Sequence, residues 1–154
     1  MKLEGKVALV TGTSPNIMGG IAEGLADEGA DLICVDINST YAERCAESVM
    51  AKGRRSVGIP CDVTDESQVV ATVDQAKREF GGVDILVNGA TQFNTKGILE
   101  MSVEEWRRQT DILLTGAFIF TKPVSYTHLR ANEPLRSRVC SLLLEKKRGG
   151  GGGG

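Results

Sequence analysis

Short apolar runs alternate along the chain with longer segments in which apolar residues recur every three or four positions. Four runs have the length and composition of buried strands: Lys6–Val10, Asp31–Asp36, Ser56–Pro60 and Val83–Val87. Each is followed by a segment of helical period: Ile21–Glu28, Tyr41–Ala51, Glu66–Phe80, and a stretch from Ser102 towards Phe120. Strands that alternate with helices pair in parallel through right-handed crossovers. The pattern therefore predicts an α/β fold with a doubly wound parallel sheet.

Residues that begin or end helices support these boundaries. Gly12–Gly20 is predicted to be a loop, and Gly29 stops the first helix. Thr64 is the expected N-cap of the third helix. Ser102 and Glu105 have the spacing of a capping box at the start of the last helix, on which Trp106 is expected to pack.

The alternation stops at Lys122. Residues 123–154 show no period and end in the hexaglycine Gly149–Gly154, which cannot pack, so we expect a disordered or non-native tail. The chain thus divides into a truncated domain, 1–122, and a tail, 123–154. Within the tail, PVSYTHLRA resembles a translated sequencing adapter, and the glycines resemble translated poly-G. A frameshift or a genuine extension is the alternative, and sequencing the source DNA across codon 122 would separate the two.

Charge and cysteine content narrow the class of protein. The net charge of −2 divides into +4 for residues 123–154 and −6 for the rest, which argues against nonspecific nucleic-acid binding. The four cysteines form no CxxC motif and the single histidine, His128, lies in the tail, so neither a metal site nor a disulfide framework is expected. No signal peptide or membrane-length apolar run is present, and we expect a cytoplasmic protein without membrane contact.

The candidate chemistry lies at the ends of the predicted strands. A glycine-rich turn that follows the first strand and opens a helix is where a Rossmann-like sheet binds a pyrophosphate, through backbone N–H groups and the helix dipole. Asp36 ends the second strand, where a carboxylate can accept hydrogen bonds from the adenosine ribose. Asp62 follows the third strand. Together they predict a dinucleotide site.

These residues resemble the short-chain dehydrogenase/reductase family over residues 6–122. Thr11–Gly12 with Asn16-Ile17-Met18 occupies the family's TGxxxGxG loop, Asp62–Val63 its Asp-Val pair, and Asn88-Gly89-Ala90 its NNAG turn, while Thr115–Gly116 lies in its N-x-x-G helix. The resemblance implies a truncated Rossmann-like domain with its four strands in the order 3-2-1-4. It also implies the following cofactor-binding set: Gly12, Ser14, Asn16, Ile17, Asp36, Asp62, Val63, Asn88, Gly89 and Ala90.

The chain departs from the family pattern at several positions. Asn16 replaces a glycine, a change that Asn tolerates because it accepts positive φ. Met18 replaces another glycine and crowds the approach to the cofactor, for which Gly19–Gly20 is expected to compensate. Gly89 and Thr91 alter the NNAG turn. Leu113 stands where the family has an asparagine that positions a water, and leucine cannot make those hydrogen bonds.

The resemblance implies an NAD(P)-dependent oxidoreductase that transfers hydride between nicotinamide and a small alcohol or ketone, with 3-oxoacyl and sugar-alcohol compounds as candidate substrates. NAD is favoured over NADP because Asp36 repels a 2′-phosphate and no Lys or Arg follows before Arg44. The intact parent is expected to be a homo-oligomer.

The family's catalytic serine, tyrosine and lysine are missing. Tyr126 with Arg130 imitates Y-x-x-x-K without its helical context, and neither this pair nor His128 is taken as catalytic. We therefore expect the chain as written to bind nucleotide weakly and to be inactive.

Two other functions fit the same residues. A non-catalytic dinucleotide-binding or sensor module would bind cofactor tightly without turnover. A methyltransferase shares the acidic residues, but its glycine loop is a tighter G-x-G-x-G. As a truncated domain, the chain should leave an edge of the fourth strand unpaired and expose apolar side chains of the last helix, which predicts a marginally stable, aggregation-prone fragment. The side chains expected to be exposed are Ile112, Leu113, Leu114, Phe118, Ile119 and Phe120.

Overall fold

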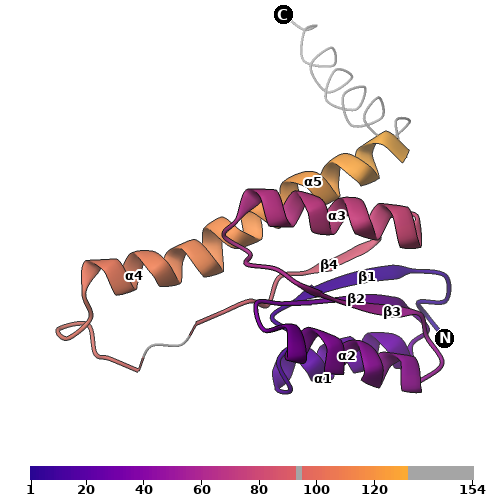
Figure 1. The fold of residues 1–154 in the computed structure, drawn as a ribbon, viewed down its shortest axis with the longest axis horizontal. Helices are drawn as coiled ribbons and strands as arrows, with labels where there is room; N and C mark the ends of the chain where they lie inside the picture. Colours follow the sequence, from indigo (N-terminus) through magenta and orange to yellow (C-terminus); the bar gives the residue numbers. More distant parts are fainter. Residues whose placement is uncertain (93–94, 132–154) are drawn as a thin grey trace, which may run out of the picture.

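The structure is a computed structural model that describes residues 1–92 and 95–131, with side chains up to residue 126. Strands and helices alternate through most of this length (Figure 1). The elements are β1 (Val7–Thr11), α1 (Ile17–Asp27), β2 (Asp31–Asp36), α2 (Ser39–Ala51), β3 (Ser56–Pro60), α3 (Glu66–Phe80), β4 (Ile85–Val87), α4 (Val103–Thr110), η1 (Asp111–Thr115) and α5 (Gly116–Ala131).

The four strands form one parallel sheet in the order β3-β2-β1-β4, which confirms the predicted fold class and strand order. Val10 of β1 pairs with Cys34 of β2 on one side and with Val87 of β4 on the other. Asp36 of β2 pairs with Pro60 of β3. All four strands run in the same direction, so their carboxyl ends meet at one edge of the sheet.

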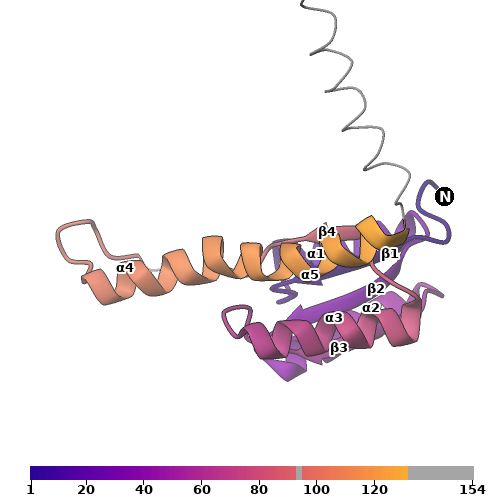
Figure 2. The ribbon, with the colours of Figure 1, turned by 90° about the horizontal axis from the view of Figure 1, so that it is seen from above.

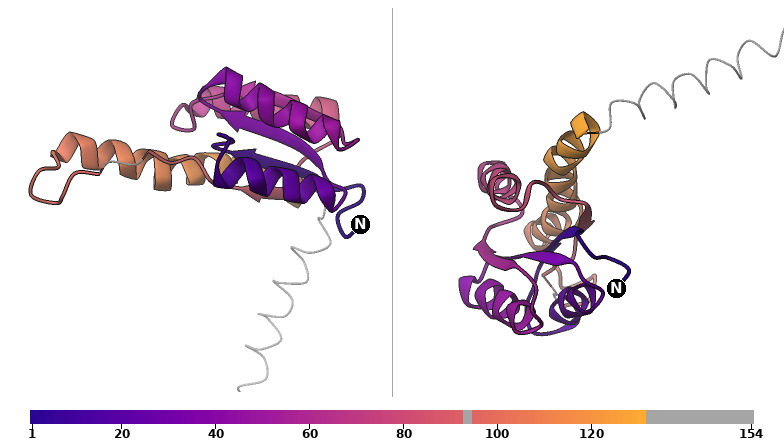
Figure 3. Two further views of the ribbon diagram at one scale, coloured as in Figure 1. Left: turned by 90° about the horizontal axis from the view of Figure 1, so that it is seen from below. Right: turned by 90° about the vertical axis from the view of Figure 1, so that its right-hand side faces the viewer.

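Helices cover both faces of the sheet. Helices α1 and α2 lie on one face, and α3 and α5 lie on the other (Figure 1; the layers are seen end-on at the right of Figure 3). Alternate side chains of β1 point to opposite faces of the sheet. Ala8 and Val10 pack with residues of α1 and α2, while Val7 and Leu9 pack with residues of α3 and α5. This alternation is what a strand buried on both sides requires.

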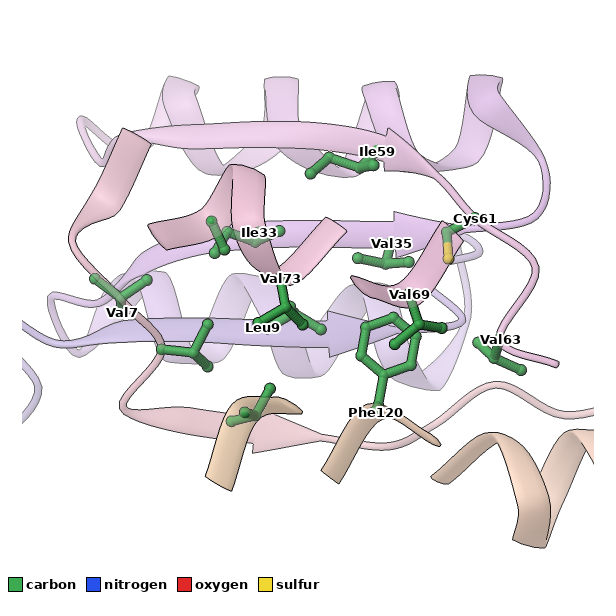
Figure 4. Close-up of a cluster of buried hydrophobic side chains, with 13 residues drawn as sticks. Val7, Leu9, Ile33, Val35, Ile59, Cys61, Val63, Val69, Val73 and Phe120 are labelled. Atoms are coloured by element: carbon green, nitrogen blue, oxygen red, sulfur yellow. The ribbon is translucent and has the colours of Figure 1, made fainter. Parts of the chain in front are cut away.

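Phe120 is the largest fully buried side chain of the described residues. Its ring lies beside Val69 of α3 and faces the strand residues Leu9 and Val35 (Figure 4). Val124, one turn further along α5, is buried in the same cluster. These contacts attach α5 to α3 and to the sheet.

Several helix boundaries differ from the sequence prediction. Helix α1 begins at Ile17, four residues before the expected start, because Gly19 and Gly20 adopt helical rather than left-handed backbone. The N-cap of α3 is Asp65, whose carboxylate accepts the N–H groups of Ser67 and Gln68, so the assignment to Thr64 was wrong. The capping box of Ser102 and Glu105 is confirmed.

Helix α5 also continues past Lys122 through Pro123 to Ala131, where no element was expected. Proline removes one N–H from the helix, the one that would bond to the carbonyl of Ile119. Burial of Val124 against the sheet accompanies the continuation. Residues 123–131 are thus helical where no element was predicted, and the remainder of the predicted tail, 132–154, lies outside the described residues. The division of the chain at Lys122 stays a prediction.

Helices α4, η1 and α5 form one long rod that extends beyond the sheet (Figure 2). In the middle, η1 is a π-helical turn in which the N–H of Gly116 donates to the carbonyl of Asp111, five residues back. Such a turn inserts one extra residue into the helix. Because of the extra residue, the position two turns before Phe120 on the same helix face is Ile112, which is half-buried. Leu113 is 53% exposed.

The protruding end of the rod has no buried residue in α4. Trp106 is 62% exposed, so the expectation that it packs was wrong. Leu114 and Phe118 are exposed as predicted for this helix, whereas Phe120 is buried rather than exposed. None of the helices in the described part of the chain is long and apolar enough to cross a membrane.

Candidate functional site

A cavity of about 640 Å³ opens at the carboxyl edge of the sheet. The sequence-predicted residues Gly12, Asp36, Asp62, Val63 and Ala90 all line it. They come from the segments that follow or end β1, β2, β3 and β4. Parallel strands thus bring together residues that are up to 78 positions apart in the chain.

The backbone of the loop after β1 packs directly against the backbone of the turn after β4. Gly12 has φ +75°, and a Cβ added there would lie 2.7 Å from the carbonyl oxygen of Gly89. Beside it, the buried Thr11 hydroxyl accepts the N–H groups of Gly89 and Ala90 at 3.0 and 3.2 Å. Only a glycine fits at position 12, for both conformational and steric reasons.

The carboxylate of Asp36 lies at the end of β2 and is almost fully buried. It accepts the backbone N–H of Asn38 at 2.9 Å, which holds the turn that leads into α2. The backbone carbonyl of the same residue accepts the N–H of Cys61. Asp36 is thereby fixed between the second and third strand ends, on the wall of the cavity.

Asp62 has a comparable local role after β3. Its carboxylate accepts both the backbone N–H of Thr64 at 2.9 Å and the hydroxyl of Thr64 at 2.7 Å. Its own N–H donates to the side chain of Gln68. These bonds fix the segment in which Val63 reaches both the cavity and the buried Gly116, where an added Cβ would lie 2.7 Å from Cγ2 of Val63.

Ser14, Asn16 and Ile17 do not line the cavity, although the family resemblance implies that they bind cofactor. They form the loop and first turn of α1, in which the carbonyl of Ser14 accepts the N–H groups of Asn16 and Gly19. Ile17 is 78% exposed. Asn16 has φ −124°, so it does not adopt a left-handed backbone, and the explanation that Asn is tolerated because it accepts positive φ was wrong.

Asn88 and Gly89 line a smaller hollow of about 80 Å³, which shares Val63, Ala90 and Ile112 with the main cavity. Leu113 lines this hollow as well, despite its exposure. The Asn88 side chain donates to the hydroxyl of Thr121 on α5 at 3.5 Å. All three residues of the predicted turn after β4 therefore line this hollow, and Ala90 lines the main cavity as well.

Sequence reasoning missed the wall that α4 and η1 supply. The residues of this wall are Glu104, Arg107, Arg108, Asp111 and Ile112. The Nε of Arg108 donates a 2.9 Å hydrogen bond to the side-chain oxygen of Gln92, which also lines the cavity. Their spacing of three and four along one helix face was visible in the sequence. Nothing in the sequence indicated that this face turns towards the sheet edge.

The ionisable lining side chains of the cavity are four carboxylates and two guanidinium groups. Cys61 also lines the cavity, and burial raises the pKa of its thiol, so it is a neutral side chain near pH 7. Deeper in the fold, a hydrogen bond with Cys45, reinforced by burial, raises the pKa of the Cys34 thiol. The three cysteines of the described residues are free thiols.

No cluster of three or more histidine, cysteine or carboxylate side chains suited to a metal ion occurs in the described ranges 1–92 and 95–131. The cavity is lined by carboxylate and guanidinium groups together with apolar side chains such as Val63 and Ile112. Such groups can hydrogen-bond to sugar hydroxyls and pack against an aromatic base.

Sequence comparison agrees with this geometry. The sequence model of the family described as short chain dehydrogenase matches residues 6–133. The chain belongs to the short-chain dehydrogenase family. Its relatives include D-threitol dehydrogenase of Mycolicibacterium smegmatis, 37% identical over 130 residues that make up 84% of this chain and 50% of the relative. Galactitol 2-dehydrogenase of Agrobacterium fabrum is 40% identical over 125 residues, covering 81% and 48% of the two chains.

The fold of this short-chain dehydrogenase chain also matches solved structures. A crystal structure of NAD⁺-bound xylitol dehydrogenase superposes with a TM-score of 0.82 at 36% identity, covering 86% of this chain and 51% of that one. The chain spans about half the length of the curated relatives it matches. Short-chain dehydrogenases use NAD or NADP, and the chain carries the part of the fold that forms the cavity described above.

Proposed function

We propose that this chain forms the dinucleotide-binding half of an NAD-dependent oxidoreductase. The observation that carries the proposal is the position of Asp36, whose buried carboxylate ends β2 and lines the same cavity as Gly12. A carboxylate there accepts hydrogen bonds from ribose hydroxyls, and the glycine loop before α1 holds the pyrophosphate with backbone N–H groups. We propose that Asp62 and Val63, which line the β3 side of the cavity, contact the adenine.

We assign the nicotinamide half of the cofactor to the part of the carboxyl edge that follows β1 and β4. Ser14, Asn16 and Ile17 sit on the helix start where an anion binds, and Asn88, Gly89 and Ala90 form the wall after β4. When bound, the cofactor supplies hydride transfer. The residues of this chain bind it, orient it and exclude water from its adenosine end.

NAD is preferred over NADP in this proposal. The carboxylate of Asp36 would face a 2′-phosphate directly, and the next two residues, Ile37 and Asn38, carry no positive charge. Like charges at hydrogen-bond range in a buried site oppose binding strongly. Arg107 and Arg108 line the cavity from α4, but the carboxylates Glu104 and Asp111 accompany them on the same helix face.

For the whole protein we propose oxidation of a small polyol or reduction of the matching ketone. The names of the relatives support this substrate class, since they include threitol, galactitol and xylitol dehydrogenases. A 3-oxoacyl substrate is the second candidate within the same reaction type. We propose that this chain by itself does not turn over, because the residues that line its cavity include no serine, tyrosine or lysine.

Cofactor titration tests the proposal. Binding of NADH is followed by nicotinamide fluorescence, and NADPH and S-adenosylmethionine are titrated in parallel by calorimetry. We expect NADH to bind about tenfold or more tightly than NADPH, and S-adenosylmethionine not to bind. Binding of S-adenosylmethionine in place of NADH would make the site that of a methyltransferase.

The variant Asp36→Ala tests the residue that carries the proposal. Removal of the carboxylate should weaken NADH binding about ten- to a hundredfold and narrow the preference for NADH over NADPH, because a lost hydrogen bond to a charged group is worth roughly 1.5–3 kcal/mol. Glu47→Ala, on α2 and outside the cavity, is the matched control. Equal NADH affinity in the Asp36 variant would show that the cavity binds something else.

A further inference from the structure

Met18 occupies the space that a side chain on residue 89 would need. A Cβ built on Gly89 would lie 2.7 Å from Cγ of Met18 and closer still to Sδ and Cε. Met18 is half-buried and also packs against the cluster beneath α1 and α2. The thioether therefore lies on the bare face of Gly89, in a gap that this glycine leaves open.

The two positions are complementary departures from one pattern. The family loop has a glycine where this chain has Met18, and the family turn has an asparagine where this chain has Gly89. In this chain the larger side chain is on the first turn of α1, and residue 89 in the turn after β4 has no side chain. Gly89 thus supplies the space that Met18 occupies, while Gly19 and Gly20 are helical in backbone, and their predicted compensation for Met18 stays a prediction.

The contact joins the two walls of the dinucleotide site. Met18 is the second residue of α1, and the first N–H groups of a helix have no intrahelical partner and attract anions. Gly89 donates its N–H to Thr11, whose neighbour Gly12 lines the cavity, and Ala90 lines both hollows. A shift of the thioether would displace the helix start relative to the turn.

We propose that Met18 is a positioning residue for the dinucleotide: its thioether, seated on Gly89, sets the spacing between the anion-binding start of α1 and the turn after β4. The proposal rests on the dinucleotide site proposed above. Methionine is unbranched and adapts its shape readily, so an intruding methyl at residue 89 should redirect the thioether at little cost in stability. Such a methyl group should therefore lower the affinity for the dinucleotide and leave the stability of the fold nearly unchanged.

The test compares NADH affinity in the full chain and in four variants: Gly89→Ala, Met18→Ala, the double variant of both, and Gly24→Ala. Gly24 lies on the exposed face of α1, and a Cβ there meets nothing within 4 Å, so it controls for a glycine-to-alanine change in the same layer. Circular dichroism at the titration temperature establishes that each variant is folded.

We expect Gly89→Ala to weaken NADH binding about tenfold and Gly24→Ala to leave it unchanged. In the double variant the clash is absent, and binding should recover to the level of Met18→Ala alone, itself about threefold weaker than the parent. Non-additivity of this size is usual for residues in contact. A purely structural role would change the unfolding midpoint and leave the NADH affinity of the folded fraction alone.

Three results would overturn the proposal. Gly89→Ala could bind NADH as tightly as the parent chain, or the double variant could be as weak as Gly89→Ala, which would assign the loss to residue 89 itself. If Gly89→Ala does not fold, Met18→Ala decides alone, and unchanged affinity in that variant refutes the positioning role. Failure of the parent chain to bind NADH is a distinct result, because it removes the proposed function and this inference with it.

Discussion

Gly12 and Gly5 share one backbone conformation but differ in their surroundings. Their φ angles are +75° and +73°, and a Cβ on Gly12 would meet the backbone of Gly89 and Ala90, whereas a Cβ on Gly5 would meet nothing within 4 Å. The pair therefore separates the cost of the left-handed conformation from the cost of the close approach at the site.

Replacement of each glycine by alanine should give unequal losses. Gly5→Ala carries only the left-handed penalty, about 1–2 kcal/mol. Gly12→Ala adds the clash with the turn after β4, for a total of about 2–5 kcal/mol, and should abolish NADH binding. Urea denaturation and NADH titration of both variants provide the comparison, and equal losses would mean that the turn yields to the added methyl.

Asp65 gives a pH dependence that can be assigned to one residue. Hydrogen bonds from the side chains of Ser67, at 2.6 Å, and Gln68, at 2.8 Å, lower the pKa of Asp65 from 3.8 to about 2. Because the folded pKa lies below the unfolded value, this stabilisation is complete above about pH 4 and is lost as the pH falls to about 2.

The matched variant is Asp65→Asn, which retains an N-cap oxygen but does not titrate. Between pH 4 and pH 2 the parent chain should lose more stability than this variant, and the two curves should be parallel above pH 5. Thermal melts followed by far-UV circular dichroism at each pH make the measurement. Parallel curves throughout would show that Asp65 is not the group responsible.

Among the site residues, the sequence predicted those that lie at the ends of strands. Gly12, Asp36 and Asp62 come directly at or after apolar runs, and parallel strands bring such positions together. The contact between Met18 and Gly89 could not be predicted in the same way. It depends on the distance between the first turn of α1 and the turn after β4, 71 positions apart in the chain. In the sequence, each of the two residues taken alone is only a departure from the family pattern.

Among the elements, the rod of α4, η1 and α5 departs most from expectation. Helical period and the capping box predicted its existence and its start at Ser102. The π turn at Asp111–Thr115 was not predictable, because DILLT contains no residue that demands a wider turn. The turn nevertheless decides that Ile112, and not Leu113, lines the larger cavity.

Two phenylalanines on α5 test how this helix is held. Phe120 is fully buried against α3 and the sheet, while Phe118 is 66% exposed. Phe120→Ala should cost about 3–5 kcal/mol and release α5 from the sheet. Phe118→Ala should change stability by no more than about 0.5 kcal/mol.

Chemical denaturation of the parent and both variants gives these values, and Trp106 provides the fluorescence signal from the neighbouring helix α4. If both substitutions cost the same, the packing of α5 is not what the buried side chains indicate.

Over the whole molecule, two surfaces remain uncovered by the described residues. β4 pairs with β1 on one side and has no second partner strand there, and the rod exposes Leu113, Leu114 and Phe118. The relatives that this chain matches are about twice as long. The low stability and self-association predicted from the sequence therefore stay predictions, to be tested by sedimentation at several concentrations.

The position of β1 in the middle of the sheet has a consequence for the order in which the molecule folds. Val10 pairs with Cys34, 24 positions later, and with Val87, 77 positions later. The β1–β2 contact closes a short loop, and the β1–β4 contact a long one that costs more chain entropy. Because the turn after β4 completes the cofactor cavity, the site should appear only in the final folding step. NADH should then slow amide hydrogen exchange most in β4, and the first three strands should exchange slowly without it.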